Sequence, residues 1–287
     1  MSKKKILFIN SGIHHKNMQG LKLLKNIQID FIDSIEQCIH LNEYEFVYFP
    51  SQTFDVSKYP DTKFVFGPHL SVLPNEKEIN ILKGLNSIYI QPSQWAVDVW
   101  KLFPCCQDLQ MKPMPFCVDT ETFCPNKSIE DRKNVMVYFK DRNHLELENV
   151  ISLLNNKGYS YQIFNYKKRY NENYFIDYLK NSKFGIWIGR HESQGFALEE
   201  SLACNVPLLV WDVTSMNQEE GSNYLDYKAT SIPYWDENCG EVFFDNSQLL
   251  STFELFISNL HNYKPREFIL NHLSSHVCEN IMNSLFS

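Results

Sequence analysis

Glu192 and Glu200 lie eight positions apart, and the residues between them have the types and spacing expected of a ligand-binding site. They lie in GRHESQGFALEESLACNVPLLVWD, residues 189–212. The run FGIWIG before them is typical of a strand and FALEESLAC is typical of a helix, so RHESQG is predicted to be a tight strand-to-helix loop. The first amides of such a helix lack intrahelical acceptors and carry the positive end of the helix dipole, so they favour an anion. These amides belong to Gly195, Phe196 and Ala197.

An anion site between two carboxylates suits a ligand that carries phosphate between two polyols, and a nucleotide sugar is such a ligand. One carboxylate would accept hydrogen bonds from sugar hydroxyls and the other from ribose hydroxyls, each contributing about 1.5–3 kcal/mol. The alternative is that Glu199 and Glu200 are an exposed helix face and that Glu192 is a capping acid. Spacing alone does not separate the two interpretations.

The stretch ESQGFALEESLACNVP resembles the E-x7-E signature of the GT-B glycosyltransferases, notably the large retaining class called family four. The usual run there is E-G-F-G-x-x-x-x-E-A-x-A-C-G-x-P, which Glu192, Gly195 and Glu200 match. The resemblance implies that Glu192 contacts the donor sugar, that Glu200 holds the ribose and that the loop amides bind diphosphate. Two departures are Ser193-Gln194 in place of Gly-Phe and Asn205 in place of the last Gly; Asn also suits a left-handed helix C-terminus.

Other segments agree with this resemblance. MPFCVDTETFCP, residues 114–125, resembles the inter-domain segment of the family, and FGPHLS resembles the strand end where members place a histidine facing the donor sugar, which implies that role for His69. Lys140 and Arg142 follow a strand where members place cations facing the diphosphate, and such cations would neutralise charge on the leaving group. Gly12 ends the first strand, where members have a glycine turn near acceptor and phosphate, so the resemblance implies that place for Gly12. The alternatives are a solvated Lys140–Arg142 pair, a structural His69 and a simple turn at Gly12.

The elements that must position these residues form two α/β series. Short apolar strands are predicted at 6–9, 43–50, 63–70 and 87–93, and QGLKLLKNI after the first has helical spacing. A second series starts with NVMVYF at 134–139 and ends with VPLLVWD at 206–212. Apolar runs buried on both sides favour parallel sheets. The predicted fold is α/β of the GT-B class, with two facing Rossmann-like domains and a cleft between them. The predicted parts are an acceptor domain 1–112, a linker 113–133, a donor domain 134–263 and a C-terminal helix 264–287 that crosses back to the first domain.

Composition excludes several functions. The chain has 287 residues, 44% hydrophobic and 21% charged, and a net charge of −7, which disfavours nucleic-acid binding. No apolar run approaches the roughly 20 residues that span a bilayer, and the start MSKKK lacks the apolar core of a signal peptide. A cytoplasmic protein is therefore expected. The eight cysteines form no CxxC pair and the nine histidines no HExxH, so we expect reduced thiols and no metal site.

The predicted activity is transfer of a sugar from a nucleotide-sugar donor to a hydroxyl acceptor, a glycan or a small molecule. The resemblance implies retention of configuration, and no metal or other cofactor is expected because cations and a helix dipole would bind the diphosphate. The sequence also lacks a D-x-D triplet. Two alternatives stay open: a nucleotide-sugar epimerase of the same fold, and an inactive glycan- or protein-binding module. The sequence does not indicate the base, the sugar, the acceptor or the oligomeric state.

Overall fold

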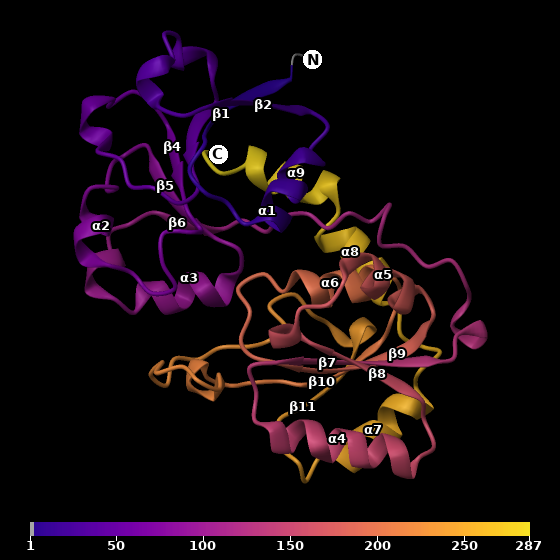
Figure 1. The fold of residues 1–287 in the computed structure, drawn as a ribbon. Helices are drawn as coiled ribbons and strands as arrows, with labels where there is room; N and C mark the ends of the chain where they lie inside the picture. The colour runs from indigo at the N-terminus through magenta and orange to yellow at the C-terminus, as the bar shows by residue number, and fades with distance from the viewer. Residues whose placement is uncertain (1–2) are drawn as a thin grey trace. The chain divides into compact units, whose positions relative to one another are not determined.

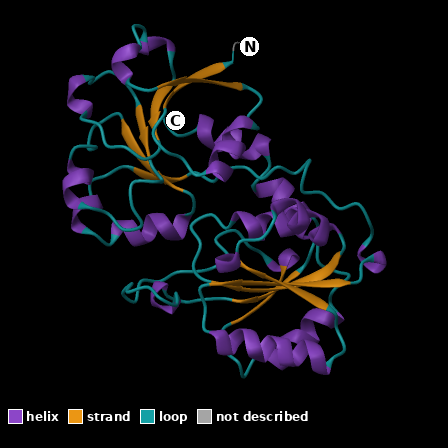
Figure 2. Ribbon diagram, in the orientation of Figure 1, coloured by secondary structure: helices purple, strands orange, loops and turns teal. Residues whose placement is uncertain are grey.

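The computed structural model describes residues 3–287, so the first two residues of the basic start MSKKK lie outside the described residues. The chain divides into two compact units (Figure 1). The first unit contains the chain up to Cys117 together with Ser275–Ser287, and the second unit is Val118–Ser274. In each unit a parallel sheet lies between layers of helices (Figure 2).

The first unit is built on a six-stranded parallel sheet in the order β2-β1-β3-β4-β5-β6. Its central strands are buried along their whole length, which is why they read as continuous apolar runs in the sequence. The strands are β1 (Lys4–Ile9), β2 (Ile27–Ile32), β3 (Phe46–Phe49), β4 (Phe64–Phe66), β5 (Ser87–Gln91) and β6 (Met111–Pro113). The helices are α1 (His15–Lys22), α2 (Glu76–Asn80), α3 (Gln94–Lys101) and α9 (Ser275–Asn283).

The helix predicted in QGLKLLKNI is partly wrong. Helix α1 already begins at His15 and ends at Lys22, and Ile27, the last residue of that run, begins β2. Only Ile27 is buried in β2, IQIDFI, and its other side chains are half-buried or exposed, because β2 is the edge strand of the sheet.

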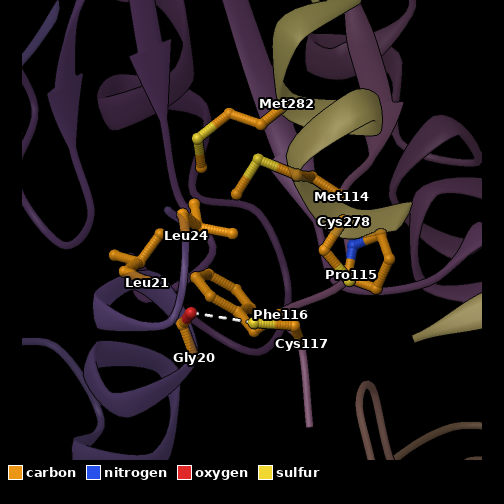
Figure 3. Close-up of a pocket in the computed structure, with 9 residues that line it drawn as sticks. All are labelled: Gly20, Leu21, Leu24, Met114, Pro115, Phe116, Cys117, Cys278 and Met282. Carbon is orange, nitrogen blue, oxygen red and sulfur yellow. Dashed lines mark hydrogen bonds between the residues drawn. The ribbon is translucent and has the colours of Figure 1, made fainter. Parts of the chain in front are cut away.

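Helix α9 packs into the first unit although it comes last in the chain. The Glu279 carboxylate accepts hydrogen bonds from the backbone N–H of Asn26 at 3.0 Å and from its Nδ2 at 2.7 Å. Lys112 Nζ donates to the Leu285 carbonyl at 2.5 Å. A small apolar pocket lies where α1, the segment after β6 and α9 meet (Figure 3). Cys117 Sγ beside it donates to the Gly20 carbonyl at 2.9 Å, so this pocket is part of the packing of α9.

The second unit is built on a five-stranded sheet in the order β11-β10-β9-β7-β8, with parallel pairing throughout. One face packs on α5, α6 and α8, and the other on α4 and α7 (Figure 1). The strands are β7 (Asn134–Lys140), β8 (Tyr161–Asn165), β9 (Ser182–Gly189), β10 (Leu208–Trp211) and β11 (Gly240–Phe243). The helices are α4 (His144–Asn156), α5 (Glu172–Lys180), α6 (Phe196–Ala203), α7 (Leu249–Ser258) and α8 (Pro265–His272).

The segment predicted as a linker and the predicted tail helix both look different in the structure. Met114, Phe116 and Val118 are buried, and the boundary between the units falls after Cys117. The tail forms two helices instead of one. Helix α8 ends before Leu273, whose side chain is buried and whose carbonyl accepts a hydrogen bond from the Val118 N–H at 2.9 Å. The chain turns there before α9, which begins at Ser275.

Two further findings concern the whole described chain. All eight cysteines are free, and five of them are buried. Within residues 3–287 we find no helix with the length and apolar character needed to cross a membrane.

Candidate functional site

The candidate site of the second unit lies at the carboxyl ends of β7 and β9. From β7 the chain continues to β8 on one side, whereas β9 pairs with β7 on the other side, so the strand order reverses between β7 and β9. Open α/β sheets bind ligands outside the carboxyl ends of the strands at such a reversal. Lys140 and Gly189, the last residues of the two strands, are direct partners in the register. Sequence neighbours of both therefore meet at this point.

A buried ion pair joins the two strand ends. Lys140 Nζ lies 2.5 Å from Glu192 Oε1, with side chains that are 8% and 15% exposed. The same Nζ lies 4.1 Å from the centroid of the Tyr166 ring, a cation–π distance. Burial acts to raise the pKa of Glu192, but Lys140 and Arg190 outweigh it and hold this pKa below its usual value. Glu192 is therefore a carboxylate at neutral pH, and Lys140 is a buried cation at the strand end.

A second group of charges flanks this pair. Arg190 lies 3.6 Å from Asp141 and 3.4 Å from Glu219, measured between guanidinium nitrogens and carboxylate oxygens. His191 Nδ1 lies 3.5 Å from the same Glu219 oxygen. Burial and then Arg190 lower the pKa of His191 to about 4, so its imidazole is neutral at pH 7. Burial raises the pKa of Glu219. This group ties the long loop after β10 to the ends of β7 and β9.

The Arg142 side chain lies against backbone carbonyls at the strand ends, whereas that of Lys140 pairs with the Glu192 carboxylate. Arg142 is 1% exposed, and its Nη1 donates at 3.0 Å to the carbonyls of Gly189 and Trp211. Its Nη2 donates to Glu146 at 2.8 Å. The guanidinium therefore braces the ends of β9 and β10, and contact with a diphosphate would break these hydrogen bonds. The alternative of a solvated Lys140–Arg142 pair is also wrong, because both residues are buried.

Helix α6 starts at a glycine in the left-handed conformation. Gly195 is the N-cap with φ +86° and ψ +42°, and as a glycine it has no side chain that could cap the helix. Phe196 and Ala197 follow as the first two helical residues and are half-buried. The left-handed conformation at Gly195 favours glycine and brings the backbone close to any ligand at the helix start. The residue expected to cap the helix in the alternative interpretation, Glu192, is not the N-cap.

Glu199 and Glu200 are both buried, so their interpretation as an exposed helix face is wrong. Their exposed fractions are 0% and 5%. Glu199 accepts from Gln194 Nε2 on both carboxylate oxygens, at 2.8 and 2.9 Å. Glu200 acts electrostatically on the Tyr170 hydroxyl, whose pKa is raised by burial first and by Glu200 among other groups. Sequence reasoning assigned a role to Glu200 and missed Glu199.

Asp212 is a second residue that sequence reasoning left without a role. It follows β10, and its Oδ1 accepts from the Ser231 N–H at 2.6 Å and from the Ser231 hydroxyl at 2.7 Å. Its Oδ2 accepts from the Thr230 hydroxyl at 2.7 Å. The Thr230 carbonyl in turn accepts from the Glu192 N–H at 3.0 Å. Asp212 therefore fixes a segment that holds the backbone of Glu192. The sequence did contain a signal for this role, because Asp212 is an acidic residue directly after the apolar run of β10.

Gly12 and His69, the other two predicted site residues, belong to the first unit. Gly12 follows β1, where the strand order reverses between β1 and β3, and it adopts φ +29°. Nearby, the Ser51 hydroxyl donates to the Ser11 carbonyl. His69 follows β4, and its N–H donates to the Pro50 carbonyl at 2.8 Å. Burial and then His14 lower the pKa of His69 to about 4. Both residues lie at the carboxyl ends of the first sheet.

Within residues 3–287, no group of three or more His, Cys, Asp or Glu side chains is arranged to hold a metal ion. Of the predicted residues of the second unit, the structure brings Lys140 and Glu192 together as an ion pair. Gly195, Phe196, Ala197 and Glu200 follow Glu192 in the loop and in α6. Arg142 instead contacts Gly189, Trp211 and Glu146.

Comparison with known proteins adds evidence on the fold. No protein-family model matches the chain, and no curated protein matches it. Among solved structures, it is similar to a sucrose-phosphate synthase from Thermosynechococcus elongatus, with a TM-score of 0.57 at 10% identity over 99% of this chain and 98% of that one. It is equally similar to the N-terminal domain of a trehalose-6-phosphate phosphatase from Candida albicans, with a TM-score of 0.57 at 10% identity over 99% and 96% of the two chains.

The chain has the GT-B fold. Two parallel α/β units of six and five strands, each with a reversal of strand order after its second strand, account for the likeness. The predicted fold class, α/β of the GT-B kind with two parallel-sheet domains, is thereby confirmed. At 10% identity the likeness concerns the fold alone, so the function of this GT-B protein is argued below from its side chains.

Proposed function

We propose that the chain is a glycosyltransferase that moves a sugar from a nucleotide-sugar donor to a hydroxyl acceptor. The observation that carries the proposal is the buried Lys140–Glu192 pair at the strand reversal of the second unit. Helix α6 begins at Phe196, four residues after Glu192, and its N-cap Gly195 is a glycine in the left-handed conformation. A cation, a carboxylate and a helix start in one loop suit a diphosphate linked to a sugar.

Each group has a separate role in this proposal. The amides of Gly195, Phe196 and Ala197 bind diphosphate oxygens, and Lys140 neutralises the charge that develops on the leaving nucleoside diphosphate. Glu192 accepts hydrogen bonds from the hydroxyls of the donor sugar. Glu200, one helical turn into α6, accepts them from the ribose. Diphosphate competes with Glu192 for Lys140, so donor binding releases the carboxylate for the sugar.

The remaining predicted residues keep narrower roles. We propose that His69 contacts the donor sugar and that Gly12 lies near acceptor and phosphate, both from the strand ends of the first unit. Arg142 is proposed as a positioning residue instead of a catalytic one, because its guanidinium is bonded to the carbonyls of Gly189 and Trp211.

We further propose retention of configuration, with the leaving-group oxygen assisting the acceptor hydroxyl. The proposal needs no divalent metal, because Lys140 and the α6 amides supply the positive charge at the diphosphate. Activity should then persist in EDTA. Loss of activity in EDTA that added Mg²⁺ restores would overturn this part.

The first experiment is a titration of the purified protein with UDP, GDP and ADP, read by calorimetry. We expect one of them to bind. Glu200→Gln should weaken that nucleotide about tenfold, whereas Glu192→Gln should reduce turnover much more than nucleotide affinity. Equal and negligible effects of the two variants would contradict the assignment. Absence of binding by all three nucleotides would favour an inactive glycan- or protein-binding module.

A second experiment separates transfer from epimerisation. The protein is incubated with the nucleotide sugar whose nucleotide it binds, and products are resolved with and without a mixture of hydroxyl acceptors. A transferase releases free nucleoside diphosphate together with a glycoside, and it releases sugar by slow hydrolysis when no acceptor is present. An epimerase returns an intact nucleotide sugar of altered configuration, which would overturn the proposed function.

A further inference from the structure

The most buried polar pair near the candidate site is the carboxamide of Gln194 and the carboxylate of Glu199. They are 5% and 0% exposed. One nitrogen, Gln194 Nε2, donates to both oxygens of Glu199, at 2.8 and 2.9 Å. A buried carboxylate is costly unless it is hydrogen-bonded, so this contact satisfies a group that the interior would otherwise disfavour.

The Gln194–Glu199 contact spans Gly195, which adopts the left-handed conformation. Between Gln194 and the helix lies Gly195, with φ +86°, and the Gly195 carbonyl accepts from the N–H groups of Leu198 and Glu199, each at 3.0 Å. The side chains of residues 194 and 199 thus join the loop to the first turn of α6 across this glycine. A helix start is commonly fixed by a side-chain cap, and α6 has none at its N-cap.

We propose that Gln194 and Glu199 form a clamp that holds the Gly195 turn in its anion-binding conformation. Gln194 and Glu199 are positioning residues here, because they act on the ligand through the amides of residues 195–197. The inference rests on the proposed function for the identity of the ligand, a nucleoside diphosphate. The conformation of the turn itself is a property of the free protein and is measurable without ligand.

The test replaces the pair by apolar side chains of similar length, in the double variant Gln194→Met/Glu199→Met. Replacing both partners of a hydrogen bond is much less destabilising than leaving one buried and unpaired. We therefore expect a melting temperature close to that of the parent protein. Hydrogen exchange of the amides at 195–198 should nevertheless be about tenfold faster, and the affinity for the nucleotide that the parent binds should fall about tenfold.

Two further variants serve as comparisons for the double variant. Glu199→Gln keeps one acceptor oxygen for Gln194 and should lose less affinity than the double variant. Asn26→Ala removes the side-chain hydrogen bond of another, partly buried amide–carboxylate contact, that with Glu279 in the first unit. It should lower the melting temperature and leave both exchange at 195–198 and nucleotide affinity unchanged.

The outcomes separate this inference from the proposed function. If the double variant keeps parental exchange rates at 195–198, the clamp is overturned, whether or not nucleotide binds. If exchange accelerates while nucleotide affinity stays at the parental value, the clamp holds the turn but does not contribute to nucleotide binding, which overturns the inference. If the parent binds none of UDP, GDP and ADP, the proposed function fails, and faster exchange in the double variant still supports the clamp.

Discussion

Lys140 Nζ lies 2.5 Å from Glu192 Oε1, so the cation that ends β7 and the acid that follows β9 neutralise each other. The two residues are 52 positions apart in the chain, and they meet because β7 and β9 are neighbours in the sheet. An internal counter-ion of this kind holds Lys140 at the strand end before any ligand arrives. A ligand that displaces Glu192 from Lys140 must therefore provide at least as much negative charge, as the diphosphate of the proposed function would.

Replacing Lys140 by methionine should reduce both stability and nucleotide affinity. The Glu192 carboxylate would stay mostly buried without its cation, so its pKa should rise and the free energy of unfolding should fall by about 3 kcal/mol. Denaturant unfolding and calorimetric titration measure the two effects. The double variant Lys140→Met/Glu192→Gln should recover most of the stability and none of the affinity. Recovery of affinity in that double variant would show that Lys140 does not bind the ligand.

Arg142→Met should be a stability variant only. The carbonyls of Gly189 and Trp211 would lose their donor inside the protein, at a cost of about 2 kcal/mol or more in the free energy of unfolding. Nucleotide affinity of the folded protein should stay within about twofold of the parental value. A loss of affinity as large as that of Lys140→Met would instead place Arg142 at the ligand.

Gly195→Ala should weaken nucleotide binding, because the left-handed conformation costs a non-glycine residue about 1–2 kcal/mol and the turn would shift to relieve it. The added Cβ would lie 3.6 Å from the Glu192 Cβ, so steric overlap within the protein does not explain the loss. The matched control is Gly158→Ala, at φ +74° after α4, where the added Cβ has no neighbour within 4 Å. Equal affinities of the two variants in calorimetry would contradict the assigned role of Gly195.

Stability should decrease as the pH falls from 6.5 towards 4. Burial lowers the pKa of His191 from 6.5 to about 4, so in this window the unfolded chain binds a proton that the folded protein does not. Glu219 beside it has a raised pKa and contributes in the opposite direction, which reduces the net effect. His191→Gln should reduce the decline in melting temperature without abolishing it, because the pKa of His69 is also lowered to about 4. His261→Gln, at a side chain that is 59% exposed, should leave the decline unchanged. Identical pH profiles of parent and His191→Gln would contradict this explanation.

Much of the fold could be predicted because its strands are buried on both faces. FGIWIG and VPLLVWD are continuous apolar runs, and such runs are strands β9 and β10 in the structure. The edge strand β2 was missed, since half of its side chains are polar or exposed and it directly follows a helical pattern. The break between α8 and α9 was missed because the contact made there, the hydrogen bond from the Val118 N–H to the Leu273 carbonyl, joins residues far apart in the chain.

The candidate site could be predicted only where it is local in sequence. The turn at Gly195 and the left-handed Asn205, with φ +56°, follow from residue types at a helix start and end. The contact of Lys140 with Glu192 depends on strand order, which the sequence does not reveal. Glu199 was passed over because charged residues on helices are usually exposed. The signal for it was Gln194 in place of the phenylalanine of the E-x7-E run, since a buried amide needs a buried partner.

The placement of α9 has a consequence for how the polypeptide matures on the ribosome. Residues 118–274 are contiguous and can complete their unit as soon as they have emerged, whereas the earlier-made residues up to 117 must wait for residues 275–287. Until α9 has been synthesised, Asn26 has no Glu279 to bond, and the surface of the first unit that α9 covers is exposed to water. The part synthesised first is thus completed last, and until then it exposes apolar surface of the kind that makes folding intermediates prone to aggregate.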